Sequence, residues 1–183
     1  MGAQQGNEEG KRKPAKEHFR TLMLDYGQDV WNYAFFLTGR REMADDISQD
    51  VFLSVFRHLN TFEGKASVKT WLFAITRNTA RNHMRTAFMR RVILVGRARP
   101  GSSHPSAESE VMEAAFTDEI WEIVMKLPTK FREVLVLDAK YEMTMGEIAL
   151  VLGVSEGTVK SRLSRARKKM SEAWKEESAY ERA

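Results

Sequence analysis

The sequence has 183 residues and no cysteine, which excludes disulfide bonds and thiolate-bound metals, and its four histidines show no metal-ligand spacing. The N-terminus is polar, and no apolar run approaches the roughly 20 residues of a membrane helix, so we expect a cytoplasmic protein without membrane insertion. The net charge is only +4, but residues 64–107 contain nine bases and no acid, and residues 157–171 contain six bases and no acid. This distribution predicts two basic surfaces of the kind that bind nucleic acid.

Apolar periodicity predicts an all-α protein made of two small helical domains. In the first half, helical patterns cover residues 16–38, 42–59 and 67–89. Glycine, proline and serine then cluster over residues 96–109, where the periodicity disappears, and this composition predicts a flexible linker. Beyond it we expect a helix over residues 109–126, a second one after Leu127 and Pro128, and a helix-turn-helix.

The expected domain boundaries follow from these patterns. They are a disordered tail over residues 1–15, a first domain over 16–90, a linker over 91–110, a second domain over 111–175 and a C-terminal tail over 176–183.

The helix expected over residues 42–59 has an apolar side and an acidic side. Five apolar residues at helical spacing predict the buried stripe: Met43, Ile47, Val51, Val55 and Leu59. The opposite side has a cluster of polar residues: Asp45, Asp46, Gln49 and Asp50. Composition alone fits a solvated surface as well as a binding site. Catalysis is disfavoured, because no nucleophile or basic partner accompanies these carboxylates.

The helix expected over residues 67–89 interleaves aromatic, amide and basic side chains. Aromatic stacking, amide hydrogen bonds and cations are the means by which proteins hold unstacked single-stranded bases. Trp71, Leu72 and Ile75 are better explained by packing in the core. The asparagines and arginines have no reason to be buried, and they are Asn78, Asn82, Arg77, Arg81 and Arg85.

Residues 144–170 predict a helix-turn-helix that binds DNA. Thr144 and Glu147 form a capping-box pattern, Gly153 is suited to end the first helix, and Ser155 is a good N-cap for a second helix starting near Glu156. Val159 and Leu163 would hold this second helix against the first. The side chains left facing outward are those that contact base edges and phosphates: Thr158, Lys160, Ser161, Arg162, Ser164, Arg165, Lys168 and Lys169.

Four segments, in this order and spacing, resemble the extracytoplasmic-function (ECF) sigma factors, the smallest class of bacterial sigma-70-type initiation subunits. They are ADDISQDVF, TWLFAITRNTARNHMR, LPTKFREVLVL and MGEIALVLGVSEGTVKSRLSRARKKM. The resemblance implies that the first domain is sigma region 2 and the second is sigma region 4. It covers most of the chain outside the N-terminal tail and the linker.

The resemblance also implies roles for residues at matching positions. The acidic helix would dock on the clamp helices of the polymerase largest subunit through Asp45, Asp46, Gln49, Asp50 and Phe52. The loop over residues 62–67 resembles the specificity loop that receives a flipped base of the minus-ten element. Residues implied in minus-ten binding are Phe62, Lys65, Ser67, Lys69, Trp71, Asn78, Arg81, Asn82 and Arg85. Those implied in minus-thirty-five binding are Thr158, Lys160, Ser161, Arg162, Ser164, Arg165 and Lys168.

A sigma factor would bind core RNA polymerase and promoter DNA, and family members are commonly held inactive by an anti-sigma factor. The resemblance therefore implies a protein that is not an enzyme, with no cofactor, no metal and no small-molecule substrate. Two alternatives stay open. A two-domain regulator could use the helix-turn-helix on duplex DNA without polymerase, and an enzyme could bind a metal through Asp45, Asp46 and Asp50, although no loop completes the coordination.

Overall fold

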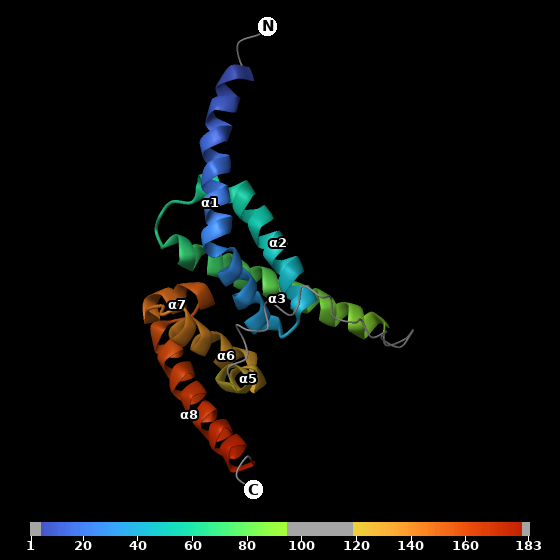
Figure 1. Ribbon diagram of the computed structural model, residues 1–183, viewed down its shortest axis with the longest axis vertical. Coiled ribbons are helices and arrows are strands. Elements are labelled where there is room, and N and C mark those ends of the chain that lie inside the picture. Colours follow the sequence, from blue (N-terminus) through green and yellow to red (C-terminus); the bar gives the residue numbers. More distant parts are fainter. Residues whose placement is uncertain (1–4, 95–118, 181–183) are drawn as a thin grey trace. The chain divides into compact units, whose positions relative to one another are not determined.

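The computed structural model describes residues 5–94 and 119–180, and within these ranges all regular structure is helical, which confirms the expected all-α class (Figure 1). Contacts divide the chain into two compact units, Met1–His83 and Met84–Ala183. No helix in the described ranges is both long and apolar enough to cross a membrane.

Unit 1 contains α1 (Gln5–Thr38), α2 (Arg41–His58), the short 3-10 helix η1 (Leu59–Thr61) and the start of α3 (Val68–Leu94), which continues into unit 2. Helix α1 ends at Gly39, whose φ of 68° is strained for residues with a Cβ atom. In the structure this helix begins at Gln5, earlier than the start near residue 16 that the sequence predicted. The expected linker over residues 91–110 lies outside the described residues after Leu94.

The core of unit 1 forms where the apolar stripes of its three long helices meet. Helices α1 and α2 pack against each other, and Tyr33 of α1 stacks on Phe73 of α3 with their ring centroids 5.0 Å apart. On α2, the middle of the expected stripe is buried at Ile47, Val51 and Val55, whereas its two ends are half-buried. This burial leaves the acidic side of α2 in solvent.

Unit 2 contains α5 (Glu119–Lys126), α6 (Thr129–Leu135), the π-helical turn η2 (Val136–Lys140), α7 (Met145–Leu152) and α8 (Glu156–Tyr180). The long helix α8 packs against α5, α6 and α7. It continues to Tyr180, so the segment expected as a C-terminal tail from residue 176 begins inside a helix. Residues 109–118 of the helix expected before Lys126 lie outside the described residues.

A buried arginine joins α5 to α6. The Arg132 Nη1 donates a hydrogen bond to the Met125 carbonyl oxygen at 2.8 Å, and its Nη2 donates to Thr129 Oγ1 at 3.3 Å. Desolvation by burial lowers the pKa of the Arg132 guanidinium from its ordinary value. These contacts fix the short turn around Pro128, on which α6 begins.

Candidate nucleic-acid interface

Helix α7 begins with the predicted capping box. Thr144 Oγ1 accepts a hydrogen bond from the Glu147 backbone N–H at 3.3 Å, and Glu147 Oε2 accepts one from the Thr144 backbone N–H at 3.0 Å. Two backbone donors that have no partner within the helix are thereby satisfied. The sequence prediction for this helix start is confirmed.

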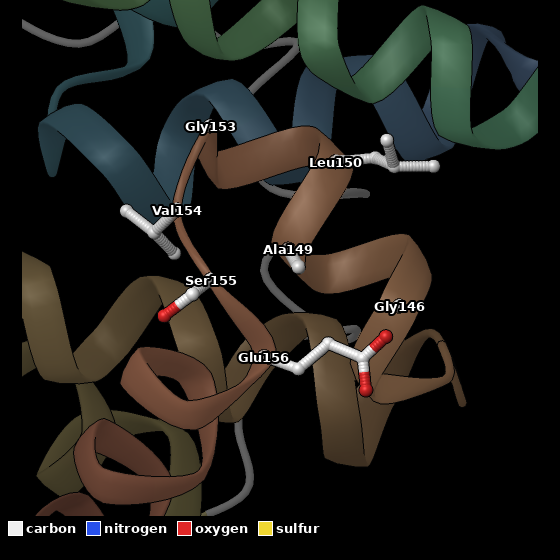
Figure 2. A pocket seen from close by; sticks show the side chains of 7 residues that line it. All are labelled: Gly146, Ala149, Leu150, Gly153, Val154, Ser155 and Glu156. Carbon is white, nitrogen blue, oxygen red and sulfur yellow. The ribbon is translucent and has the colours of Figure 1, made fainter.

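The turn between α7 and α8 also has the predicted geometry. Gly153 has φ 59° and ψ 43°, the left-handed conformation that glycine tolerates best. Ser155 then caps α8, because its Oγ accepts a hydrogen bond from the Thr158 backbone N–H at 3.2 Å. Figure 2 shows this turn beside α7, with the carboxylate of Glu156 directed toward Gly146. A Cβ atom at Gly146 would lie 3.2 Å from Glu156 Oε1, so this glycine permits the close approach.

The second helix of the motif presents a polar, basic face to solvent. Its buried stripe contains the two predicted residues, Val159 and Leu163, together with Ala166. The exposed side chains are Lys160, Ser161, Ser164, Arg165, Lys168 and Lys169. Helix α8 therefore has the shape and chemistry of a helix that lies in the DNA major groove.

Two side chains expected on this outer face have contacts within the unit instead. Arg162 Nη1 lies 3.3 Å from Glu133 Oε1, and the side chain of Glu133 is only 7% exposed. Arg162 is half-buried and directed toward this carboxylate, so it does not face outward as expected. Thr158 is half-buried, with its hydroxyl 3.0 Å from Ser155 Oγ in the helix cap.

A second ion pair braces the other side of the same helix. Arg167 Nη2 lies 2.8 Å from Asp138 Oδ2 on η2. Two arginines of α8, five residues apart, therefore form ion pairs with acids of α6 and η2. Sequence reasoning missed both pairs. The acid Glu133 inside the apolar run FREVLVL was the one signal that a buried partner was required.

Helix α3 carries the amide and arginine face that the sequence predicted. Four exposed side chains fall on one side of this helix by their spacing: Asn78, Arg81, Asn82 and Arg85. Arg77 was also expected to be exposed, but only 8% of it is exposed. It follows Phe73 by four residues and precedes Ala80 by three, which places it on the buried side of α3.

The loop before α3 is held by local contacts. Ser67 Oγ accepts a hydrogen bond from the Thr70 backbone N–H at 3.1 Å, so this expected minus-ten residue is the N-cap of α3. The half-buried rings of Phe62 and Trp71 lie 4.8 Å apart at an angle of 36°. Lys65 is exposed and forms an ion pair with Glu63, and Lys69 is half-buried. The loop thus packs Phe62 against Trp71, which lies on α3 about two helical turns before Asn78.

The acidic face of α2 is exposed at all four predicted positions, but its two outer carboxylates have partners on other helices. Asp45 Oδ1 accepts a hydrogen bond from Trp31 Nε1 of α1 at 2.6 Å. Asp50 Oδ2 lies 2.7 Å from His83 Nε2 of α3. In the described ranges, no group of three or more His, Asp or Glu residues could hold a metal ion.

Phe52, expected on the docking surface, is buried instead. Its side chain is only 8% exposed and packs edge-on against Phe19 of α1, with ring centroids 6.2 Å apart. The large exposed apolar residues of α2 are Leu53 and Phe56, at 47% and 52%. Sequence reasoning missed them, although they follow Gln49 by four and seven residues and so continue its side of the helix.

Comparison with known proteins gives matches for both units. The family model of sigma-70 region 2 matches residues 22–87, and that of sigma-70 region 4 matches residues 117–170. The chain is 30% identical over 160 residues to the ECF RNA polymerase sigma factor EcfG of Rhodopseudomonas palustris, and the match covers 86% of each protein.

Two solved structures resemble the chain. The sigma factor RpoE of Bartonella quintana, in complex with the anti-sigma factor NepR, gives a TM-score of 0.71 at 24% identity, covering 87% of this chain and 98% of that chain. At this identity the likeness shows the fold alone. CnrH in complex with the cytosolic domain of CnrY gives a TM-score of 0.62 at 28% identity, covering 87% of this chain and 89% of that chain.

Proposed function

Because the chain belongs to the extracytoplasmic-function sigma factors of the sigma-70 family, we propose that it docks on core RNA polymerase, recognises the minus-thirty-five and minus-ten promoter elements, and promotes DNA melting. The observation that carries this proposal is the presence of two exposed nucleic-acid faces of different chemistry in one chain. One is the basic helix of a capped helix-turn-helix, and the other is the amide and arginine face of α3.

Unit 2 would anchor the protein on duplex DNA. Arg165 and Lys168 are exposed cations suited to phosphates, which supply affinity and register. Lys160, Ser161 and Ser164 are exposed near the start of α8, the part of a recognition helix that contacts base edges. Arg162 is left out of this set because Glu133 holds it.

Helix α3 would capture the separated non-template strand. Amide side chains both donate and accept hydrogen bonds, and arginines add cationic contacts, so the α3 face can hold an unpaired base and its flanking phosphates. Removing a base from the stack costs a few kcal/mol, whereas stacking on an aromatic side chain returns about 1 to 3 kcal/mol per base. Strand capture would therefore make melting favourable only at suitable sequences.

Polymerase docking would use the acidic face of α2, where Asp45, Asp46, Gln49 and Asp50 are exposed. The exposed Leu53 and Phe56 extend this face with an apolar part. Control by an anti-sigma factor is also part of the proposal, because the family resemblance implies it and CnrH forms a complex with the cytosolic domain of CnrY.

Run-off transcription with purified core polymerase and a promoter library tests the proposal. A sigma factor is expected to produce promoter-specific transcripts, and the selected sequences would identify both elements. A gel shift with and without core polymerase distinguishes a sigma factor from a regulator that binds duplex DNA without polymerase. Tight, specific binding to duplex DNA without core polymerase, combined with no transcript in its presence, would reject the sigma function.

Replacing Arg165 by alanine is expected to weaken promoter binding for all sequences alike. Loss of one phosphate contact reduces the slope of log affinity against log salt by about one. Binding measured over a range of salt concentrations checks this result. Lys175→Ala is the matched control, because this exposed lysine of α8 lies beyond the region 4 match and its removal should leave the slope unchanged.

Replacing Lys160 by alanine is expected to change specificity instead. Losing a base contact should cost about 1 to 3 kcal/mol at one or two positions of the upstream element and leave the other positions unaffected. Competition binding with single-base variants of that element measures the change. A position-by-position preference identical to that of the wild type would show that Lys160 does not contact bases.

A further inference from the structure

The acidic face of α2 is framed by two aromatic N–H donors from different helices. Trp31 Nε1 of α1 donates to Asp45 at 2.6 Å, and His83 Nε2 of α3 lies 2.7 Å from Asp50. A carboxylate can only accept hydrogen bonds, so the proton in the second contact belongs to the histidine ring. Within the described part of the chain, Asp46 and Gln49, which lie between these two positions, form no side-chain hydrogen bond or ion pair.

Both donors are themselves held in place. The Trp31 ring stacks on Phe35 at 5.5 Å, with only 6° between the ring planes. The His83 side chain is 27% exposed, so about three-quarters of it is covered by the protein. Each donor can therefore restrict the rotamer of the carboxylate that it contacts, and the two contacts connect α2 to α1 and to α3.

We infer that Trp31 and His83 are positioning residues for polymerase docking, which fix Asp45 and Asp50 in the orientation that a basic partner surface meets. This inference rests on the proposed docking of α2. A surface carboxylate that is already ordered loses less conformational entropy when it binds. The interaction with His83 also connects the docking helix to α3, the helix that carries the proposed strand-binding face.

Variants can remove each donor while keeping the side chain's bulk. Trp31→Phe removes the Nε1 donor and retains a ring that can stack on Phe35. His83→Gln keeps a side-chain N–H near Asp50, whereas His83→Leu removes it, and both replacements are good helix formers. We expect Trp31→Phe and His83→Leu each to weaken binding to core polymerase about 3- to 10-fold. His83→Gln should bind within about twofold of the wild type.

Double variants separate positioning from general destabilisation. Trp31→Phe should have no further effect on polymerase affinity in an Asp45→Ala background, because the carboxylate that Trp31 Nε1 contacts is absent there. In an Asp46→Ala background the effects should add, since Trp31 does not contact Asp46. Affinity of the full-length chain for core polymerase would be measured by titration, with the melting temperature of each variant as a check on folding.

Each outcome has one meaning. If Asp46→Ala weakens binding but Trp31→Phe and His83→Leu do not, the positioning inference is rejected and the docking face stands. If Asp46→Ala and Asp45→Ala both leave affinity unchanged, the docking proposal itself fails. Should Trp31→Phe lower the melting temperature, the His83→Leu and His83→Gln pair decides, and equal loss in both variants would overturn the inference.

Discussion

Reversing the charge of Asp46 to lysine, alone and together with Asp50→Lys, is expected to abolish binding to core RNA polymerase without unfolding unit 1. Both side chains are exposed, and the buried stripe of α2 at Ile47, Val51 and Val55 is untouched. Removing one partner of a buried interfacial charge pair costs about 2 to 5 kcal/mol of binding free energy, and charge reversal adds repulsion. We therefore expect the double variant to lose at least about 100-fold in affinity for core polymerase.

Co-purification with core polymerase measures this effect, and circular dichroism checks the helical content. The single Asp46→Lys variant is the more direct test, because Asp50→Lys also removes the ion pair with His83. Asp25→Lys, at an exposed position of α1, controls for the change in net charge. If the double variant co-purifies at the wild-type yield, α2 is not the docking helix.

The features that could be predicted from sequence are those determined by neighbouring residues. The cap formed by Thr144 and Glu147 joins residues three positions apart, and the left-handed turn at Gly153 depends on one residue. Ser155 caps α8 through a residue only three positions away. Such signals act within one helical turn, so they can be recognised in the sequence without knowledge of the tertiary contacts.

The errors arose where a partner distant in sequence decides the environment of a side chain. Arg162 is held by Glu133, 29 residues earlier. Phe52 is buried because Phe19 of α1 covers it, which the periodicity of α2 alone could not indicate.

This division explains why the exposed faces of α3 and α8 were largely predictable and the tertiary contacts of the neighbouring residues were not. The amides of α3 and the bases of α8 are exposed, so they do not contribute to the packed core. By contrast, Trp31 and His83, which contact the acidic face of α2, carry no local signal of these contacts. Their proposed roles follow from tertiary contacts between helices.

Replacing Asn78 and Asn82 by alanine is expected to stop open-complex formation while polymerase association and upstream-element binding stay near normal. Within the described residues neither asparagine side chain forms a hydrogen bond, so the fold does not depend on them. Alanine can neither donate nor accept a hydrogen bond, so it cannot hold a base or sugar of the melted strand.

Permanganate reactivity of unpaired thymines would measure opening, and run-off transcription would measure its consequence. Gln28→Ala is the matched control, because it removes an exposed amide from α1, where Gln28 Nε2 donates a hydrogen bond to Asn32 Oδ1 of the same helix at 2.9 Å. If the defect lies in capturing the separated strand, an artificial bubble across the downstream element should restore transcription only in part. Complete restoration would mean that the asparagines assist strand separation alone, and full activity of the double variant on ordinary duplex promoter would reject the strand-binding role of α3.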